Sequence, residues 1–273
     1  MSAPSTERIA FTRRLADVGE QVFTAAPDGS CVRQITFSAD HGESWSPAWS
    51  PDGRRLCVVS RRDGTSSLYV LAADGHSEQR PLTDLPTDLD QPAWSRDGTR
   101  IAFCQGDGNG PDRIMVLHLA SGEVTQLTSP SLLDGSPAWS PDGQLLAFRR
   151  CFGAPGGIHV VLADGGEARF VVPGDNPRFA PGGAHLAFSH AEAIWVTPLT
   201  ADAHVCGVAT RLTGVIGARD RHPCWSPDGS EILFAREAYL GEDREPHLMV
   251  VRADGGEARH VCPGSEPDWT VVS

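Results

Sequence analysis

Six polar residues that each stand directly before a proline are the first candidates for chemistry in this chain. They are Ser46, Gln91, Ser136, Asn176, His222 and Glu266. A histidine can act as a general base near neutral pH, or it can join a carboxylate in binding a divalent metal. Amide and hydroxyl side chains donate and accept hydrogen bonds. If these residues meet in space, they predict a polar pocket for a small molecule or a peptide.

Other reactive or recognition residues stand close to these prolines in the sequence. They are His41, Glu43, Trp45, Asp134, Arg178 and Arg219. Trp45 has two interpretations: it anchors a partner, as loop aromatics often do, or it packs beneath its own loop. Elsewhere, the arginine pairs at strand ends could collect a carboxylate ligand in this acidic chain, or they could form ordinary surface ion pairs; these pairs are Arg13 with Arg14, Arg61 with Arg62 and Arg149 with Arg150.

The elements that must position these side chains come from an internal repeat. The octapeptide SPAWSPDG occurs at 46–53 and again at 136–143, and related copies begin at 91, 176, 222 and 266. One aromatic residue marks each copy, and these anchors recur 40 to 46 residues apart. The anchors are Trp49, Trp94, Trp139, Phe179, Trp225 and Trp269. A period of this length is typical of the blades of a β-propeller.

Each copy reads as four short strands that are separated by glycine-containing turns. The chain begins with the second to fourth strands of a blade and ends with a first strand. We therefore predict an all-β, single-domain fold over 1–273: a six-bladed β-propeller of four-stranded antiparallel blades, closed by pairing of the N- and C-terminal strands. The predicted blades are 5–37 with 266–272, 46–83, 91–128, 136–172, 176–213 and 222–262. Each anchor should pack between adjacent blades.

This strand order assigns the loops to two faces of the ring. The Asp-Gly turns and the glycine turns after the third strands form one face, here called the turn face. The connections between blades and the loops after the second strands form the other, the long-loop face. Loops held by a rigid scaffold usually carry function. The predicted ligand-binding set at the channel mouth on the long-loop face is His41, Glu43, Trp45, Gln91, Asp134, Asn176, Arg178, Arg219, His222 and Glu266.

Two alternatives remain for that mouth. It could be a hydrogen-bonded funnel that holds no ligand. It could also bind a metal through His41 and His222 with Glu266 or Gln91, but the two histidines come from opposite sides of the predicted ring. We therefore expect no metal and no other cofactor.

The composition of the chain limits the classes of partner that it is expected to bind. The formal net charge of −12 argues against nucleic acid and anionic membranes, which both attract positive surfaces. No apolar run is long enough to span a bilayer, and the N-terminus lacks the pattern of a secretory signal. The seven cysteines are scattered without a C-x-x-C motif, which favours a reducing compartment. We expect a cytoplasmic monomer.

The repeated P-x-W-S-P-D-G motif resembles that of the TolB-type propellers, which are related to WD-type propellers. The resemblance covers essentially the whole chain. It implies a six-bladed propeller, but such propellers serve as protein-binding modules, as gating domains of peptidases and as polysaccharide lyases, so fold alone does not give function. No G-x-S-x-G motif of an appended hydrolase domain is present.

The expected function is therefore that of a cytoplasmic binding or scaffolding propeller, which holds a protein segment or a small molecule at the mouth on the long-loop face. The alternative is a stand-alone enzyme, a lyase or cyclase of specialised metabolism, with His41, His222, Arg178 or Glu266 as working groups.

Overall fold

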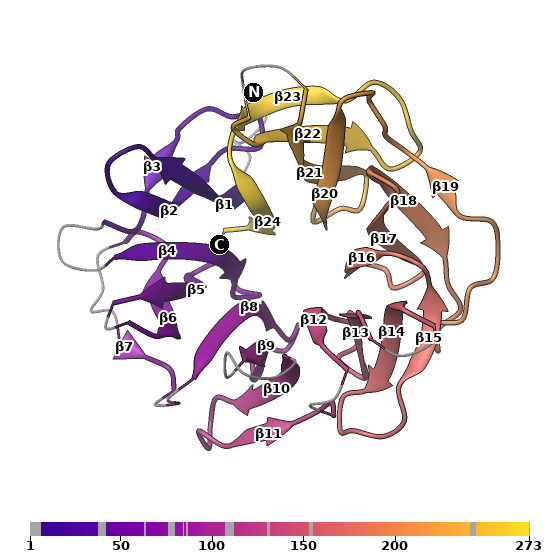
Figure 1. The fold of residues 1–273 in the computed structure, drawn as a ribbon, viewed down its shortest axis with the longest axis horizontal. Helices are drawn as coiled ribbons and strands as arrows, with labels where there is room; N and C mark the ends of the chain where they lie inside the picture. The colour runs from indigo at the N-terminus through magenta and orange to yellow at the C-terminus, as the bar shows by residue number, and fades with distance from the viewer. Residues whose placement is uncertain are drawn as a thin grey trace.

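The computed structural model describes residues 7–37, 42–62, 64–75, 80–83, 85, 87–106, 112–129, 132–152, 155–240 and 244–272. These residues form six four-stranded antiparallel sheets arranged in a ring around a central axis (Figure 1). The all-β class, the number of blades and the strand order are those predicted from the repeat. Blade 1 is the sheet β24-β1-β2-β3, and blades 2 to 6 follow in chain order.

Each blade has an innermost strand, which pairs with a second strand. The innermost strands, in blade order, are β24 (Ser265–Val271), β4 (Glu43–Trp49), β8 (Asp88–Trp94), β12 (Asp134–Trp139), β16 (Asp175–Phe179) and β20 (Ala218–Trp225). The second strands are β1 (Glu7–Leu15), β5 (Arg55–Arg61), β9 (Arg100–Gly106), β13 (Leu145–Arg150), β17 (His185–His190) and β21 (Glu231–Ala238).

The two outer strands complete each blade. The third strands are β2 (Gly19–Ala25), β6 (Ser66–Ala72), β10 (Arg113–His118), β14 (Gly157–Leu162), β18 (Ala193–Pro198) and β22 (His247–Arg252). The fourth are β3 (Arg33–Gln34), β7 (Arg80–Pro81), β11 (Val124–Gln126), β15 (Arg169–Val172), β19 (Thr210–Arg211) and β23 (Arg259–Pro263). No helix of the described chain is long and apolar enough to cross a membrane.

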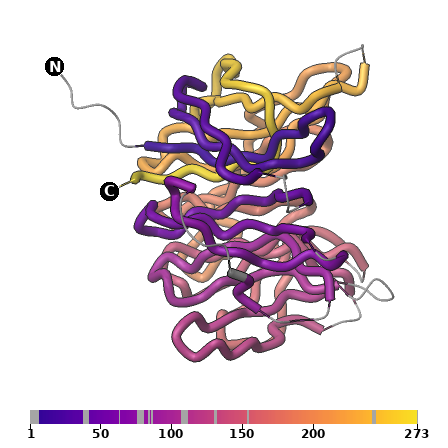
Figure 2. The backbone as a smooth tube through the Cα atoms, turned by 90° about the vertical axis from the view of Figure 1, so that its left-hand side faces the viewer, coloured from indigo at the N-terminus to yellow at the C-terminus, as the bar shows by residue number. Residues whose placement is uncertain are grey.

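Blade 1 closes the ring, because it contains both the first and the last strand of the chain. β24 pairs antiparallel with β1, with Ile9 opposite Trp269 and Glu7 opposite Val271. The two strands run side by side where indigo meets yellow (Figure 2). This pairing removes the free sheet edge that an open ring would expose.

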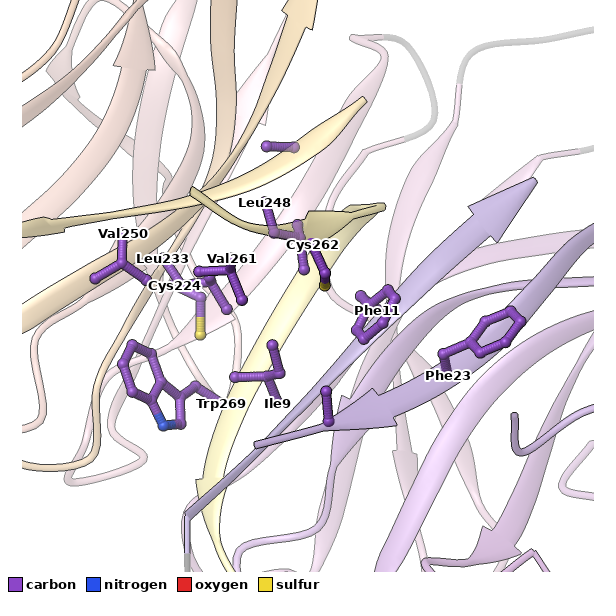
Figure 3. Close-up of a cluster of buried hydrophobic side chains, with 12 residues drawn as sticks. Ile9, Phe11, Phe23, Cys224, Leu233, Leu248, Val250, Val261, Cys262 and Trp269 are labelled. Atoms are coloured by element: carbon purple, nitrogen blue, oxygen red, sulfur yellow. The ribbon is translucent and has the colours of Figure 1, made fainter. Parts of the chain in front are cut away.

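The aromatic anchors pack between blades, as expected. Trp49 contacts Ala10 and Val22 of blade 1 as well as Leu56 and Val58 of its own blade. Figure 3 shows the equivalent cluster at the seam of the ring, where Trp269 lies in one core with residues of blades 6 and 1. Each hydrophobic cluster of the structure spans two neighbouring blades in this way, so the core is a ring of inter-blade layers.

The Asp-Gly turns are stabilised by the same hydrogen bonds in blade after blade. Asp52 Oδ1 accepts the Ser50 hydroxyl at 2.6 Å, and Gly53 adopts a φ of 68°. Glycine takes a positive φ without steric cost. In blade 3, the equivalent hydrogen bond from Ser95 is the main reason why the pKa of Asp97 falls to about 2. Hydrogen bonds that favour the charged carboxylate thus fasten these turns.

Several connections are shorter than the sequence suggested, because the innermost strands begin before the residue that precedes proline. β4 starts at Glu43, β12 at Asp134 and β20 at Ala218. Trp45, Asp134 and Arg219 therefore lie in strands and not in loops. The strand pairing therefore fixes the direction of these side chains and the residues that each can contact.

Candidate functional site

The six residues before proline form a ring at the narrow end of the channel, here called the mouth ring. All six adopt a positive φ between 47° and 53°, and the pairing register of the innermost strand shifts beside each of them. Such a shift is a β-bulge, and proline suits it because a bulge interrupts the ladder. Together with Arg178 and four of the prolines next to them, these residues line a cavity of about 50 Å³.

Hydrogen bonds between neighbouring blades occupy most side chains of the mouth ring. Glu266 Oε2 accepts the Ser46 N–H at 3.0 Å, and Gln91 Oε1 accepts the Ser136 N–H at 2.6 Å. The Asn176 side chain donates to Ser136 Oγ at 3.2 Å. These bonds join blades 1 to 2, 3 to 4 and 4 to 5, so they couple the bulges to each other and leave few polar atoms for a ligand.

His222 is the exception in the mouth ring. Its Nδ1 atom is buried and has no hydrogen-bond partner among the described residues. Burial is also the main reason why the pKa of His222 lies below its usual value; the charge of Glu266 acts in the opposite direction. His222 is therefore neutral near pH 7.

Asp90, next to the mouth ring, is a buried carboxylate with a raised pKa. It accepts hydrogen bonds from Trp45 Nε1 at 2.9 Å and from the Gln91 N–H at 2.8 Å. Burial, reinforced by the charge of Glu266, raises the pKa of Asp90 to about 6. This aspartate connects blade 3 to Trp45 of blade 2, and its charge is penalised at neutral pH.

The remaining predicted residues lie away from the mouth cavity. Asp134 is 1% exposed, and both of its oxygens accept from Arg150 at 2.8 Å. Arg219 forms an ion pair with Glu237 at 2.6 Å. The structure thus assigns both residues to ion pairs between the first and second strands of their blades. His41 lies outside the described residues.

Trp45 and Glu43 pack on the flank of β4. Trp45 lies against the guanidinium of Arg61, 5.3 Å from the ring centroid, in addition to its bond to Asp90. The carboxylate of Glu43 abuts Gly19 so closely that a Cβ there would overlap with it. Of the two interpretations of Trp45, the structure therefore favours packing over a free anchor.

A much larger cavity of about 370 Å³ opens on the turn face, and the sequence analysis overlooked it. Its walls include the six anchors and prolines of the Asp-Gly turns. Its inner surface is formed by the residue between proline and anchor in each blade, a set that we call the floor ring. The floor ring is Ala48, Ala93, Ala138, Arg178, Cys224 and Asp268. The sequence signal for this cavity is the variable position of the repeat. It is alanine in blades 2 to 4 and a polar or reactive residue in blades 5, 6 and 1.

The polar half of the floor ring contains one anion and one cation. Asp268 accepts the Trp49 N–H at 2.6 Å, and the Cys224 thiol lies 3.5 Å from its other oxygen. Burial is the main cause of the raised pKa of Asp268 and of Cys224. Arg178 Nη1 reaches the carbonyls of Pro177 and Pro137 at 3.2 and 3.4 Å.

Arg178 thus lies where the two cavities meet, because it lines both. From the repeat, Arg178 is predicted at the mouth only. Across the described residues, no group of three histidine, cysteine, aspartate or glutamate side chains is arranged to hold a metal. The polar side chains that line the channel offer hydrogen bonds and charge.

Comparison with known families identifies the repeat. A family model described as the TolB beta propeller domain matches residues 90–272. At the sequence level, 49 residues are 49% identical to the uncharacterized peptidase YuxL of Bacillus subtilis (strain 168), and 76 residues are 40% identical to the Tol-Pal system protein TolB of Thioalkalivibrio sulfidiphilus (strain HL-EbGR7). These matches cover 17% and 27% of this chain but only 7% and 17% of the two relatives.

Solved structures agree with this family. TolB from Acinetobacter baumannii superposes with a TM-score of 0.79 at 22% identity, over 99% of this chain and 68% of that one. A putative TolB from Agrobacterium tumefaciens gives a TM-score of 0.73 at 18% identity, over 97% and 92% of the respective chains. At such identities the likeness concerns the fold.

Proposed function

The chain belongs to the TolB β-propeller family, and on that premise we propose that it is a binding propeller that holds a protein segment against its long-loop face. The observation that carries this proposal is a pair of exposed apolar loops on blade 6. Ile216 is 99% exposed and Leu240 is 65% exposed. Exposed apolar side chains that lie together are typical of protein-binding surfaces.

The two loops are held together, which makes them a defined surface. The N–H groups of Tyr239 and Leu240 both donate to the carbonyl of Gly217, at 2.9 and 3.3 Å. The Tyr239 hydroxyl donates to Glu192 at 3.0 Å, which fixes the same loop to blade 5. A surface that is ordered before binding loses less entropy when a partner docks.

The narrow mouth favours a partner on the face over a small molecule inside it. Ligand pockets for small molecules usually measure about 300–1,000 Å³, whereas the mouth cavity measures about 50 Å³. A protein segment needs no deep pocket, because it can lie across the loops and bury their apolar side chains.

Charge near the mouth adds a preference for a basic segment. Burial and the charges of Glu266 and Glu43 raise the pKa of Glu20, so these three carboxylates are close enough to repel one another. A lysine or arginine of the partner would relieve that repulsion.

Matched surface variants test the proposal. The tagged chain captures partners from a lysate of its own source, alongside an Ile216→Ser/Leu240→Ser variant and a Leu162→Ser/Val208→Ser control. The control residues are 59% and 87% exposed but lie on the turn face. We expect a protein that binds wild type and control and is lost from the long-loop variant. Capture that survives in the long-loop variant, or that disappears in the control, contradicts the proposal.

A further inference from the structure

The wide cavity on the turn face is a second candidate site, independent of the docking surface proposed for the opposite face. Its volume of about 370 Å³ falls in the range that small-molecule pockets usually occupy. Three alanines line one half of its floor, and the aromatic anchors surround them. That half offers apolar contact, whereas the other half offers charge.

Two arginines of this cavity have unused hydrogen-bond donors. Arg178 on the floor donates only through Nη1, to two carbonyls at long distances, and its Nε and Nη2 groups have no partner among the described residues. Arg96 stands at the rim, where four of the other five copies of the motif have proline, and it forms no ion pair or hydrogen bond with the described chain. A guanidinium presents its donors in a planar fork that matches carboxylate and phosphate oxygens.

The acid beside Arg178 does not neutralise it by direct contact. Asp268 and Arg178 form no ion pair within 4.0 Å; instead the Asp268 oxygens accept from the Trp49 N–H at 2.6 Å and from the Cys224 thiol at 3.5 Å. Asp268 is thus bound to the wall, and Arg178, which also lines the cavity, keeps N–H groups without a partner among the described residues.

We propose that the wide cavity binds a small organic monocarboxylate, with its carboxylate on the Arg178 guanidinium and its apolar body against the alanine side of the floor ring. The apolar half of the cavity selects an organic acid over an inorganic anion. The nearby Asp268 and the net charge of −12 disfavour a dianion such as phosphate. Arg96 at the rim attracts the anion over a longer distance.

The seven tryptophans make the test specific. In a ¹H–¹⁵N spectrum, five indole signals report on the cavity, from Trp49, Trp94, Trp139, Trp225 and Trp269. Trp45 and Trp195 are internal controls, because neither lines the cavity. We expect phenylacetate to shift cavity signals and to leave the two controls unchanged. Neutral phenylacetamide should require at least about tenfold higher concentrations, because it lacks the charge that strengthens a hydrogen bond to arginine.

Variants then assign the effect to the two arginines. Arg178→Gln should weaken phenylacetate binding by at least about tenfold and leave binding of the amide unchanged. Arg178→Lys should lose part of the affinity, because it keeps the charge without the fork. Arg96→Gln should weaken binding a few-fold, and this loss should fade at high salt.

Three results would overturn the proposal: equal binding of the acid and the amide, full phenylacetate affinity in a folded Arg178→Gln variant, or shifts of Trp45 and Trp195 as large as those of the anchors. Stronger binding of inorganic phosphate than of phenylacetate would also overturn the choice of a monocarboxylate. If Arg178→Gln does not fold, the acid–amide comparison on the wild-type protein decides. None of these results depends on partner capture at the long-loop face.

Discussion

The two ends of the channel use the same strands for different purposes. At the narrow end, polar residues of the mouth ring form hydrogen bonds across three of the junctions between blades. Two residues further along each strand, the floor ring surrounds a cavity in which a guanidinium has unused donors. Polarity alone therefore does not identify a binding residue; what matters is whether its hydrogen bonds are already made within the fold.

The largest expected effect tests whether the cavity wall is structural. Trp139 packs between blades 3 and 4 and donates to the Ala93 carbonyl at 3.0 Å. Trp139→Ala should lower the free energy of unfolding by about 3–5 kcal/mol. Denaturant unfolding measures this, with Arg178→Gln as a control from the same cavity. A loss of unfolding free energy below about 1 kcal/mol would mean that Trp139 does not hold the two blades together.

The next effect contrasts the two rings directly. Gln91→Ala removes the acceptor of the Ser136 N–H and of the Cys104 thiol. Leaving such donors unpaired should destabilise the protein by about 1–3 kcal/mol. Arg178→Gln should change the free energy of unfolding by less than about 0.5 kcal/mol, because Arg178 has only two long bonds to lose. Equal losses of unfolding free energy in the two variants would show that the mouth ring and the floor ring do not differ in their contribution to stability.

A third test uses the pH dependence of the mouth. The pKa of Asp90 is raised to about 6, so its contribution to stability is complete below the unfolded value of 3.8 and is lost as pH rises through about 6. Asp90→Asn keeps the acceptor oxygen without the charge. It should raise stability at pH 8 by about 1–3 kcal/mol and have little effect at pH 4. Thermal unfolding at both values measures this. A variant that is destabilised at pH 8 would show that the charge is needed.

The smallest expected effect concerns Arg219, which was predicted from the sequence to be a ligand-binding residue. Arg219→Ala breaks a half-exposed ion pair with Glu237, which should cost about 0–1 kcal/mol and less at high salt. Urea titrations at two salt concentrations check this. A loss that is large and independent of salt would assign Arg219 to a tighter network.

The fold was predictable because its signals are local and repeated. An aromatic anchor recurs in all six copies and an Asp-Gly turn in four of them, so the packing around Trp49 and Trp139 could be predicted from the repeat. The predicted positions of Ser46, Gln91 and His222 around the channel also follow from the repeat, since equivalent positions in a ring meet at its axis.

The backbone conformation and the hydrogen-bond partners of those residues were not predictable from the repeat. Serine, glutamine, histidine and glutamate rarely adopt a positive φ, so nothing in their types announces a bulge. The partner of Gln91 is an N–H 45 residues away, and the partner of Asp134 is set by strand register. Arg178 was predicted at the mouth but lines both cavities, because the sequence does not show which way a side chain next to a bulge points.

The central claim is that the wide end of the channel binds a ligand and the narrow end holds the blades together. A crystal soaked in 4-bromophenylacetate tests this most directly, because the anomalous signal of bromine locates the ligand. We predict one bromine peak in the wide cavity, with the carboxylate on Arg178 and the mouth ring unchanged. A peak beside His222 and Glu266 in the mouth, or no peak at a concentration that saturates the indole signals, would contradict the account.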